Sequence, residues 1–289
     1  MIEFIVKNRC TGYACSLSLA LGFLQLAGYA YAQDLTATQR MAEQGSADEI
    51  GVARDAQQAV AWYRKNAEQG NASGQFLLGE SYSTGTGVAQ DAQQAVFWFR
   101  KAAEQGYAEA QVALGKKYAT GTGVAQDAKQ ALVWYRKAAE QGHAEAQVLL
   151  GLKYETGTGV AQDDKQALAW YRKAAEKGNA IAQTNLGSSY ANGKGVAQDD
   201  KQALAWYRKA AEQGNAVAQT SLGALYLLGE GVPQDDSLAY VWLSVAVANG
   251  GSSDAKKLRD LAAKKLSHGQ LEVSQKLAGQ YFEKYQPSR

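Results

Sequence analysis

The sequence predicts an all-α protein built as an α/α solenoid, a row of stacked helix-turn-helix units. A 36-residue unit recurs along most of the 289-residue chain, and each copy contains two segments with the apolar spacing of a helix. The chain also has only two prolines, which suits a helical protein because proline disrupts helix interiors. A repeat of this length indicates units that each bury one face against the next.

Five full units follow one another directly, at 67–102, 103–138, 139–174, 175–210 and 211–246. Residues 33–66 keep the end of a unit but lack most of its first helix, so we predict an N-terminal cap there. We predict a C-terminal helical cap at 247–285 and a short tail at 286–289. Atypical end units are expected because one of their faces has no neighbouring unit.

Each unit is predicted to hold a first helix, helix A, and a second, helix B. In the second unit we place helix A at about 108–120 and helix B at about 127–141. Asp127 is expected to accept from the backbone N–H of Gln130, whose side chain would reach back to form a capping box. Gly142 follows helix B, where a left-handed residue commonly ends a helix.

The positions that recur in every unit predict the interior. Leu114, Gly115 and Tyr118 share one face of helix A, while Trp134 and Tyr135 recur on helix B. A glycine in a helix interior costs about 1 kcal/mol relative to alanine, so its return predicts the close approach of a neighbouring helix. All six tryptophans lie 36 residues apart, and we expect them to fill gaps between units.

The first 32 residues have the pattern of a secretory signal peptide. A basic start precedes an apolar stretch at 16–28, and small residues precede the predicted cleavage point after Ala32. We therefore expect an exported protein, periplasmic or secreted. The alternative is a membrane anchor, but a spanning helix needs about 20 apolar residues and this stretch is shorter and contains Gln25. Cys10 and Cys15 lie inside the signal, so no disulfide is expected in the exported chain.

Composition and motifs do not point to chemistry or to nucleic acid. The net charge of +2 gives no reason to expect a nucleic-acid partner, and no stable membrane insertion is expected after signal cleavage. His143 and His268 lack companion ligands, so we expect no metal, cofactor or catalytic group. Acidic pairs occur at three helix B starts, as at Asp163-Asp164, and an aspartate occurs at every one, which favours helix capping over cation binding.

The units resemble Sel-one-like repeats, the SLR branch of the tetratricopeptide-type α/α solenoids. The shared motif A-x-A-Q-x-x-L-G-x-x-Y-x-x-G-x-G-V-x-x-D-x-x-x-A-x-x-W-Y-x-K-A-A-x-x-G is present at 108–142, and again at 144–178 and 180–214. This resemblance implies a right-handed superhelical scaffold that binds proteins or peptides. It is specific for fold and weakly specific for function, because solenoids serve many partners.

The candidate binding residues are those that vary while the frame is fixed. On helix A they are spaced by 4, 3 and 4 residues, which places them on one face opposite the recurrent interior. In solenoids of this type the A helices line the concave surface, where extended ligands lie. The candidates on this A-helix face are Glu80, Glu109, Lys116, Glu145, Leu149, Leu152, Asn185, Ser188 and Asn192.

The sequence thus predicts an exported repeat scaffold that binds a protein or peptide through its concave face and has no catalytic activity. The alternative is an envelope enzyme that acts on peptidoglycan-like or β-lactam substrates. Some exported SLR proteins are linked to β-lactam binding and hydrolysis, but that subgroup relies on paired cysteines within its repeats. The repeats of this chain contain no cysteine.

Overall fold

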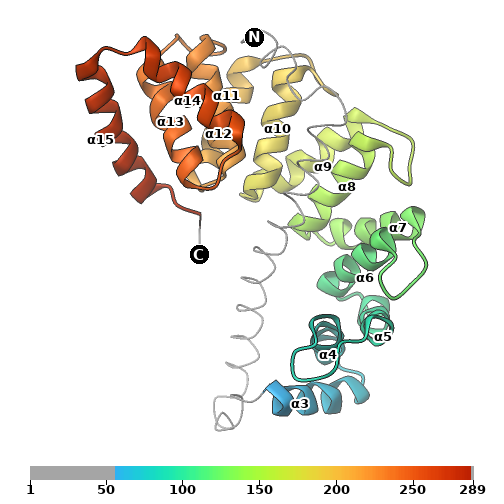
Figure 1. The fold of residues 1–289 in the computed structure, drawn as a ribbon. Helices are drawn as coiled ribbons and strands as arrows, with labels where there is room; N and C mark the ends of the chain where they lie inside the picture. Colours follow the sequence, from blue (N-terminus) through green and yellow to red (C-terminus); the bar gives the residue numbers. More distant parts are fainter. Residues whose placement is uncertain (1–55, 288–289) are drawn as a thin grey trace. The chain divides into compact units, whose positions relative to one another are not determined.

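The computed structural model describes residues 56–287 (Figure 1). Over this range the chain forms thirteen α-helices and no strand, which confirms the all-α class. The predicted signal peptide, both cysteines and residues 33–55 of the predicted cap lie outside the described residues. Residues 60–287 belong to one compact unit, and the packing described below is that of this unit.

Twelve of the thirteen helices described contain 13 residues. Their bounds are α3 (Ala56–Glu68), α4 (Ala72–Thr84), α5 (Ala92–Glu104), α6 (Ala108–Thr120), α7 (Ala128–Glu140), α8 (Ala144–Thr156), α9 (Asp164–Glu176), α10 (Ala180–Asn192), α11 (Asp200–Glu212), α12 (Ala216–Leu228), α13 (Asp236–Ala248), α14 (Ser253–Lys265) and α15 (His268–Lys284).

The helices alternate between the A and B positions of the repeat. The even-numbered helices α4 to α12 are A helices, and each packs against the B helix that follows it. Each B helix from α5 to α11 also packs against the A helix of the next unit. This neighbour-to-neighbour packing is the arrangement of an α/α solenoid, as predicted. At the C-terminal end α14 and α15 both pack on α13 (Figure 1).

Aspartates begin the B helices, but the expected capping box does not form at them. The side chain of Asp127 accepts from the backbone N–H groups of Lys129 and Gln130, at 2.9 and 3.0 Å. The backbone N–H of Asp127 donates to the carbonyl of Tyr118 at 2.9 Å, so Gln130 has no donor to reach back to. At Ser267 and Gln270, which begin α15, both halves of a capping box are present.

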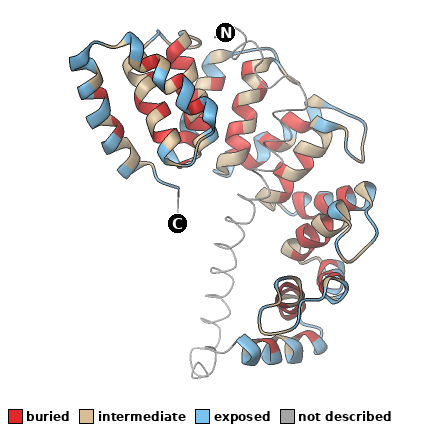
Figure 2. Ribbon diagram, viewed as in Figure 1, coloured by how far each residue is buried: buried red, intermediate tan, exposed pale blue. Residues whose placement is uncertain are grey.

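The predicted interior is confirmed, and the recurrent glycine accommodates an aromatic ring. Leu114 is fully buried, and a Cβ on Gly115 would lie 2.5 Å from Cε1 of Tyr135. The same fit joins Gly151 to Tyr171 and Gly187 to the Tyr207 ring. Each unit therefore needs glycine at this position because a side chain of its own B helix occupies the space, an aromatic ring in the first four units and Leu243 in the last. Figure 2 shows the buried residues running through successive helices.

The tryptophans are less buried than predicted. Trp134 and Trp242 are 9% and 5% exposed, but Trp62 is 47% exposed. Among the described residues the largest fully buried side chains are Tyr135 and Tyr171. Tyrosine fills the gap inside three units, and Phe99 and Leu243 fill it in the first and last full units. The tryptophan lies nearer the surface, and in four units a lysine three residues later covers its ring. The expectation that all six tryptophans fill gaps between units agrees with the burial of Trp134 and Trp242 and is wrong for Trp62.

A hydrogen bond that was not predicted joins each B helix to the next unit. Arg136 Nη2 donates to the hydroxyl of Tyr154 at 2.7 Å, and the same pair recurs 36 residues away in both directions. The pairs are Arg64–Tyr82, Arg100–Tyr118, Arg136–Tyr154, Arg172–Tyr190 and Arg208–Tyr226, at 2.7–3.1 Å. Their constant separation of 18 residues was a sequence signal for this contact.

Candidate partner-binding surface

The nine candidate residues lie on four successive A helices, α4, α6, α8 and α10. Except for Glu80 they are partly exposed. Glu80 is only 7% exposed, so the expectation that it is presented to a partner is wrong. It lies near Lys117, whose pKa is lowered by burial and partly restored by the Glu80 charge. Glu80 is buried and Lys117 is half-buried, so this pair belongs to the packing between units.

Two of the candidates form an ion pair with each other. Lys116 Nζ on α6 lies 2.6 Å from Glu145 Oε1 on α8, and both side chains are about one-third exposed. Glu109, on the first turn of α6, is partly buried. The pair therefore presents both charges at the surface in a fixed position between two units.

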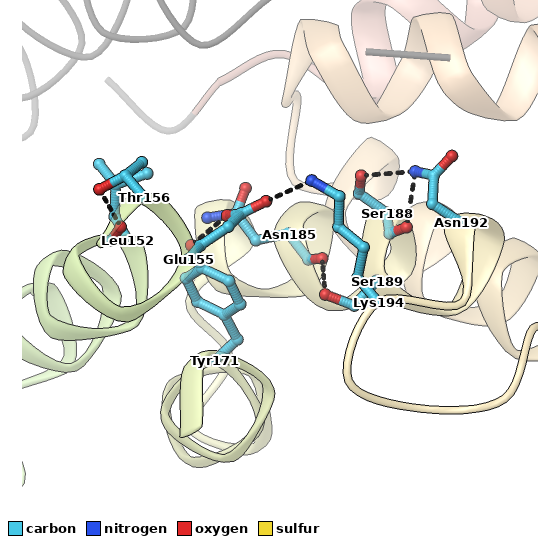
Figure 3. Close-up of polar contacts among 9 residues, drawn as sticks. All are labelled: Leu152, Glu155, Thr156, Tyr171, Asn185, Ser188, Ser189, Asn192 and Lys194. Carbon is cyan, nitrogen blue, oxygen red and sulfur yellow. Dashed lines mark hydrogen bonds and ion pairs between the residues drawn. The ribbon is translucent and has the colours of Figure 1, made fainter. Parts of the chain in front are cut away.

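A second polar cluster joins α8, α9 and the loop after α10 (Figure 3). The Tyr171 hydroxyl donates to Glu155 Oε2 at 2.8 Å, and Lys194 Nζ donates to Glu155 Oε1 at 3.0 Å. Burial raises the pKa of Tyr171, and the nearby Glu155 charge raises it further. Glu155 thus ties a buried ring to a half-exposed lysine, and it was not among the predicted site residues.

The candidates on α10 are small and polar. Asn192 Nδ2 donates to the backbone carbonyl of Ser188 at 2.9 Å and lies 3.2 Å from its hydroxyl (Figure 3). The backbone carbonyl of Asn185 accepts from Ser189 at 3.0 Å. The Asn185 amide itself is partly exposed, so this part of the face offers both hydrogen-bond donors and acceptors to a partner.

The candidates on α8 add an apolar patch between the charged and the amide-rich parts. Leu149 packs against the buried cluster around Leu150, and Leu152 is partly exposed. The Thr156 hydroxyl bonds back to the Leu152 carbonyl at 2.9 Å. In chain order the A-helix face therefore changes from charged at α6 through apolar at α8 to amide-rich at α10.

The residues weighed for chemistry have structural roles. His143 is the N-cap of α8, and its Nδ1 accepts from the backbone N–H of Ala146 at 3.3 Å. His268 is exposed and pairs with Glu272 at 3.2 Å. Asp163 caps α9, as predicted. Over residues 56–287, no group of three or more potential ligands is arranged to hold a metal ion.

The repeats match a known protein family in sequence. The sequence model of the Sel1 repeat family matches residues 25–71, 72–107, 108–143, 144–179, 180–215 and 216–251. The chain belongs to the Sel1 repeat family. From 72 onward the matched ranges begin at the first residue of each A helix, five residues after our unit boundaries. Sel1 repeat proteins generally serve as scaffolds for protein interaction and are generally not catalytic.

Two solved structures are similar over most of this Sel1 repeat chain. A Sel1 repeat protein from Oxalobacter formigenes is 36% identical, with a TM-score of 0.68 over 78% of this chain and 93% of that one. A protective antigen of uropathogenic Escherichia coli with an SLR fold is also 36% identical, with a TM-score of 0.57 over 85% of this chain. The chain spans about 60% of the length of that antigen. The comparison with curated proteins gave no significant match.

Among the helices of residues 56–287, none combines the length and the apolar character that crossing a membrane requires.

Proposed function

We propose that this Sel1 repeat protein is an exported scaffold that binds a protein or peptide partner through its A-helix face. The observation that supports the proposal is that the exposed side chains of the A helices change from unit to unit while the buried residues of the repeat stay the same. Successive A helices present the Lys116–Glu145 ion pair, then leucines, then the amide and hydroxyl groups of α10. An extended partner that lies across these helices meets a different surface at each unit, which fixes its register.

From α5 to α11 the B helices vary less from unit to unit than the A helices do. Helices α9 and α11 have the same 13-residue sequence, and in each the arginine bonds to a tyrosine of the next unit while a lysine covers the tryptophan ring. A partner on this side would meet the same groups at α9 and α11, and the exposed Phe97 of α5 and Val133 of α7 are replaced there by alanine. The B-helix side therefore provides the frame, and we assign recognition to the A-helix face.

A charge swap tests the proposal with little risk to folding. The double variant Lys116→Glu with Glu145→Lys keeps the ion pair and the net charge but reverses the polarity that a partner meets. The matched control exchanges Lys129 and Glu140, both exposed on α7. The assay is quantitative capture of partners from the exported fraction of the producing cells, with circular dichroism to check helicity.

We expect the A-face swap to weaken capture at least tenfold, equivalent to about 1.4 kcal/mol, because close charge pairs across an interface couple by that much or more. The α7 swap is expected to leave capture unchanged. Loss of capture with the α7 swap but not with the A-face swap would move the binding surface to the B helices.

The proposed place of action is the periplasm or the outside of the cell, on the basis of the signal-like pattern of residues 1–32. Cell fractionation combined with N-terminal sequencing tests this proposal. We expect a mature chain that begins at Gln33, and an uncleaved chain in the cytoplasm would refute it.

A further inference from the structure

A second surface recurs once per unit, at the junction between a B helix and the next A helix. We call it the edge groove. It is formed by the glycine after one B helix, a glutamine on the next A helix, and the tryptophan and C-cap residue of the following B helix. In the last unit these residues are Gly214, Gln219, Trp242 and Asn249.

The last edge groove is filled by the chain's own C-terminal segment. The rings of Tyr281 and Tyr285 contact Trp242, with centroids at 5.1 and 5.4 Å and the second ring stacked. The Tyr285 carbonyl accepts from Asn249 Nδ2 at 3.2 Å and lies 3.4 Å from Gln219 Nε2. The backbone of residues 286–287 passes so close to Gly214 that a side chain there would collide with it. This groove therefore already functions as a peptide-binding site within the chain.

Two units earlier the equivalent groove is open. It is a pocket of about 550 Å³ that includes Gly142, Gln147, Trp170 and Lys177, which correspond to the four residues of the last groove. Lys173 also lines it, and its ammonium lies 4.0 Å from the centroid of the Trp170 ring.

The open groove contains a buried oxygen with no hydrogen-bond partner. In the other units the A-helix glutamine accepts from the C-cap residue 30 positions later, in the pairs Gln75–Gln105, Gln111–Gln141, Gln183–Gln213 and Gln219–Asn249, at 2.7–3.1 Å. Here the C-cap residue is Lys177, which cannot form the same amide pair and donates to the Gly142 carbonyl at 2.7 Å. Gln147 is only 3% exposed, and its Oε1 has no partner.

The chemistry of the pocket defines its ligand. A buried amide oxygen without a donor favours a ligand that brings an N–H group, because an unpaired buried acceptor costs free energy. Trp170 offers a ring for an aromatic side chain, as Trp242 does for Tyr285. Two lysines and two glutamates, Lys173, Lys177, Glu140 and Glu176, line the pocket, so it has no strong preference for a charged ligand.

We propose that the edge groove at Gln147 binds a segment of a partner protein that resembles residues 281–287 of this chain. The segment ends a helix with two aromatic residues four positions apart and continues beyond the helix end. One ring packs on Trp170, a backbone N–H donates to Gln147 Oε1, and Lys177 turns from Gly142 to a carbonyl of the segment. The inference rests on the proposed scaffold function but names a different surface and the chemistry of the partner.

The test uses a fluorescent peptide with the sequence of residues 278–289 and the full chain, with binding followed by anisotropy. Lys177→Gln gives this unit the residue that the α11 unit has at Gln213, so we expect the glutamine pair to form and peptide affinity to fall at least tenfold. The reverse variant, Gln213→Lys, frees the oxygen of Gln183, and we expect it to add a second binding site. Equal affinity in the unmodified chain and in Lys177→Gln would overturn the inference.

Two further experiments distinguish a failure of this inference from a failure of the proposed function. The Lys116–Glu145 swap is expected to leave peptide binding unchanged. If the swap abolishes peptide binding while Lys177→Gln does not, the edge groove is not the peptide-binding site. The proposed binding function of the A-helix face would then be retained. Analytical ultracentrifugation of the unmodified chain completes the test. Dimers that disappear in Lys177→Gln would show that the occupant is a second copy of this chain and not a partner, whereas a monomer is the expected result.

Discussion

The Tyr171–Glu155–Lys194 cluster allows a sharp test of how the two helices of one unit are held together. Replacing Tyr171 by Phe keeps the ring that fits against Gly151 and removes only the hydroxyl that donates to Glu155 at 2.8 Å. Hydrogen bonds to charged groups contribute about 1.5–3 kcal/mol. The Glu155 side chain is 29% exposed and retains Lys194, so water can replace part of the lost bond.

We therefore expect Tyr171→Phe to lower the free energy of unfolding by about 1.5 kcal/mol, at the lower end of that range. For a chain of this size the loss corresponds to a melting temperature about 3–6 °C lower. The assay is urea and thermal unfolding followed by circular dichroism at 222 nm.

The chain supplies a matched control one unit earlier. Tyr135 fills the same position against Gly115, but Ala119 stands where Glu155 stands in the next unit. Tyr135→Phe is therefore expected to change the free energy of unfolding by less than about 0.5 kcal/mol. Equal losses in the two variants would show that the Glu155 bond does not contribute and would refute the reasoning.

Three further predictions follow from burial. Burial raises the pKa of Tyr135 and Tyr171, with nearby glutamates adding to it, so above pH 10 the folded state keeps protons that the unfolded state loses. Stability is then expected to fall by roughly 1.4 kcal/mol per pH unit for each tyrosine, and urea midpoints that stay constant from pH 10 to 11 would contradict this. Burial lowers the pKa of Lys153, because the charged ammonium is less stable there than in water. Lys153→Met should therefore raise the urea midpoint at pH 7, and this gain should shrink as the pH approaches 10.5. A lower midpoint of the variant at pH 7 would contradict the prediction. Gly115→Ala should lower the free energy of unfolding by about 1–2 kcal/mol, because the added Cβ overlaps the Tyr135 ring. Gly279→Ala, where a Cβ meets no neighbour, should raise the free energy of unfolding by about 0.5–1 kcal/mol. Similar effects at both sites would refute the overlap at Gly115.

The local features of the fold were predictable because they depend on short-range chemistry. Helix A was predicted at 108–120 and α6 spans Ala108–Thr120, while α7 lies between the predicted cap Asp127 and Gly142. Aspartate caps and left-handed glycines act within a few residues, so a repeated pattern reveals them. The position of Gly115 also predicted a close neighbour correctly, although the sequence did not show that this neighbour is the Tyr135 ring.

The features that the sequence did not reveal depend on contacts between different helices, within a unit or between units. Glu80 occupies a variable position, but it is buried near Lys117, which belongs to the next unit. The capping box at Asp127 failed because the carbonyl of Tyr118, on the preceding helix, takes the aspartate N–H. A face assigned from helical periodicity alone cannot account for neighbours that approach from another unit.

The open edge groove shows how a single departure from the repeat becomes visible only in three dimensions. Lys177 stands at a C-cap position that carries glutamine or asparagine in the other units, but the sequence does not show what that side chain contacts. Its effect appears 30 residues earlier, where the oxygen of Gln147 loses the donor that other units supply. The spacing of 30 residues could have revealed the glutamine pairs, but not the pocket.

The central claim, that a protein partner lies along the A helices, is tested most directly by site-specific photo-crosslinking. A photoreactive residue is placed at Leu152 or Ser188 on the A-helix face, and at the exposed Val133 or Ala169 on the B helices. We expect crosslinks to one partner from the first two positions and none from the last two. Crosslinks from only the B-helix positions would contradict the account.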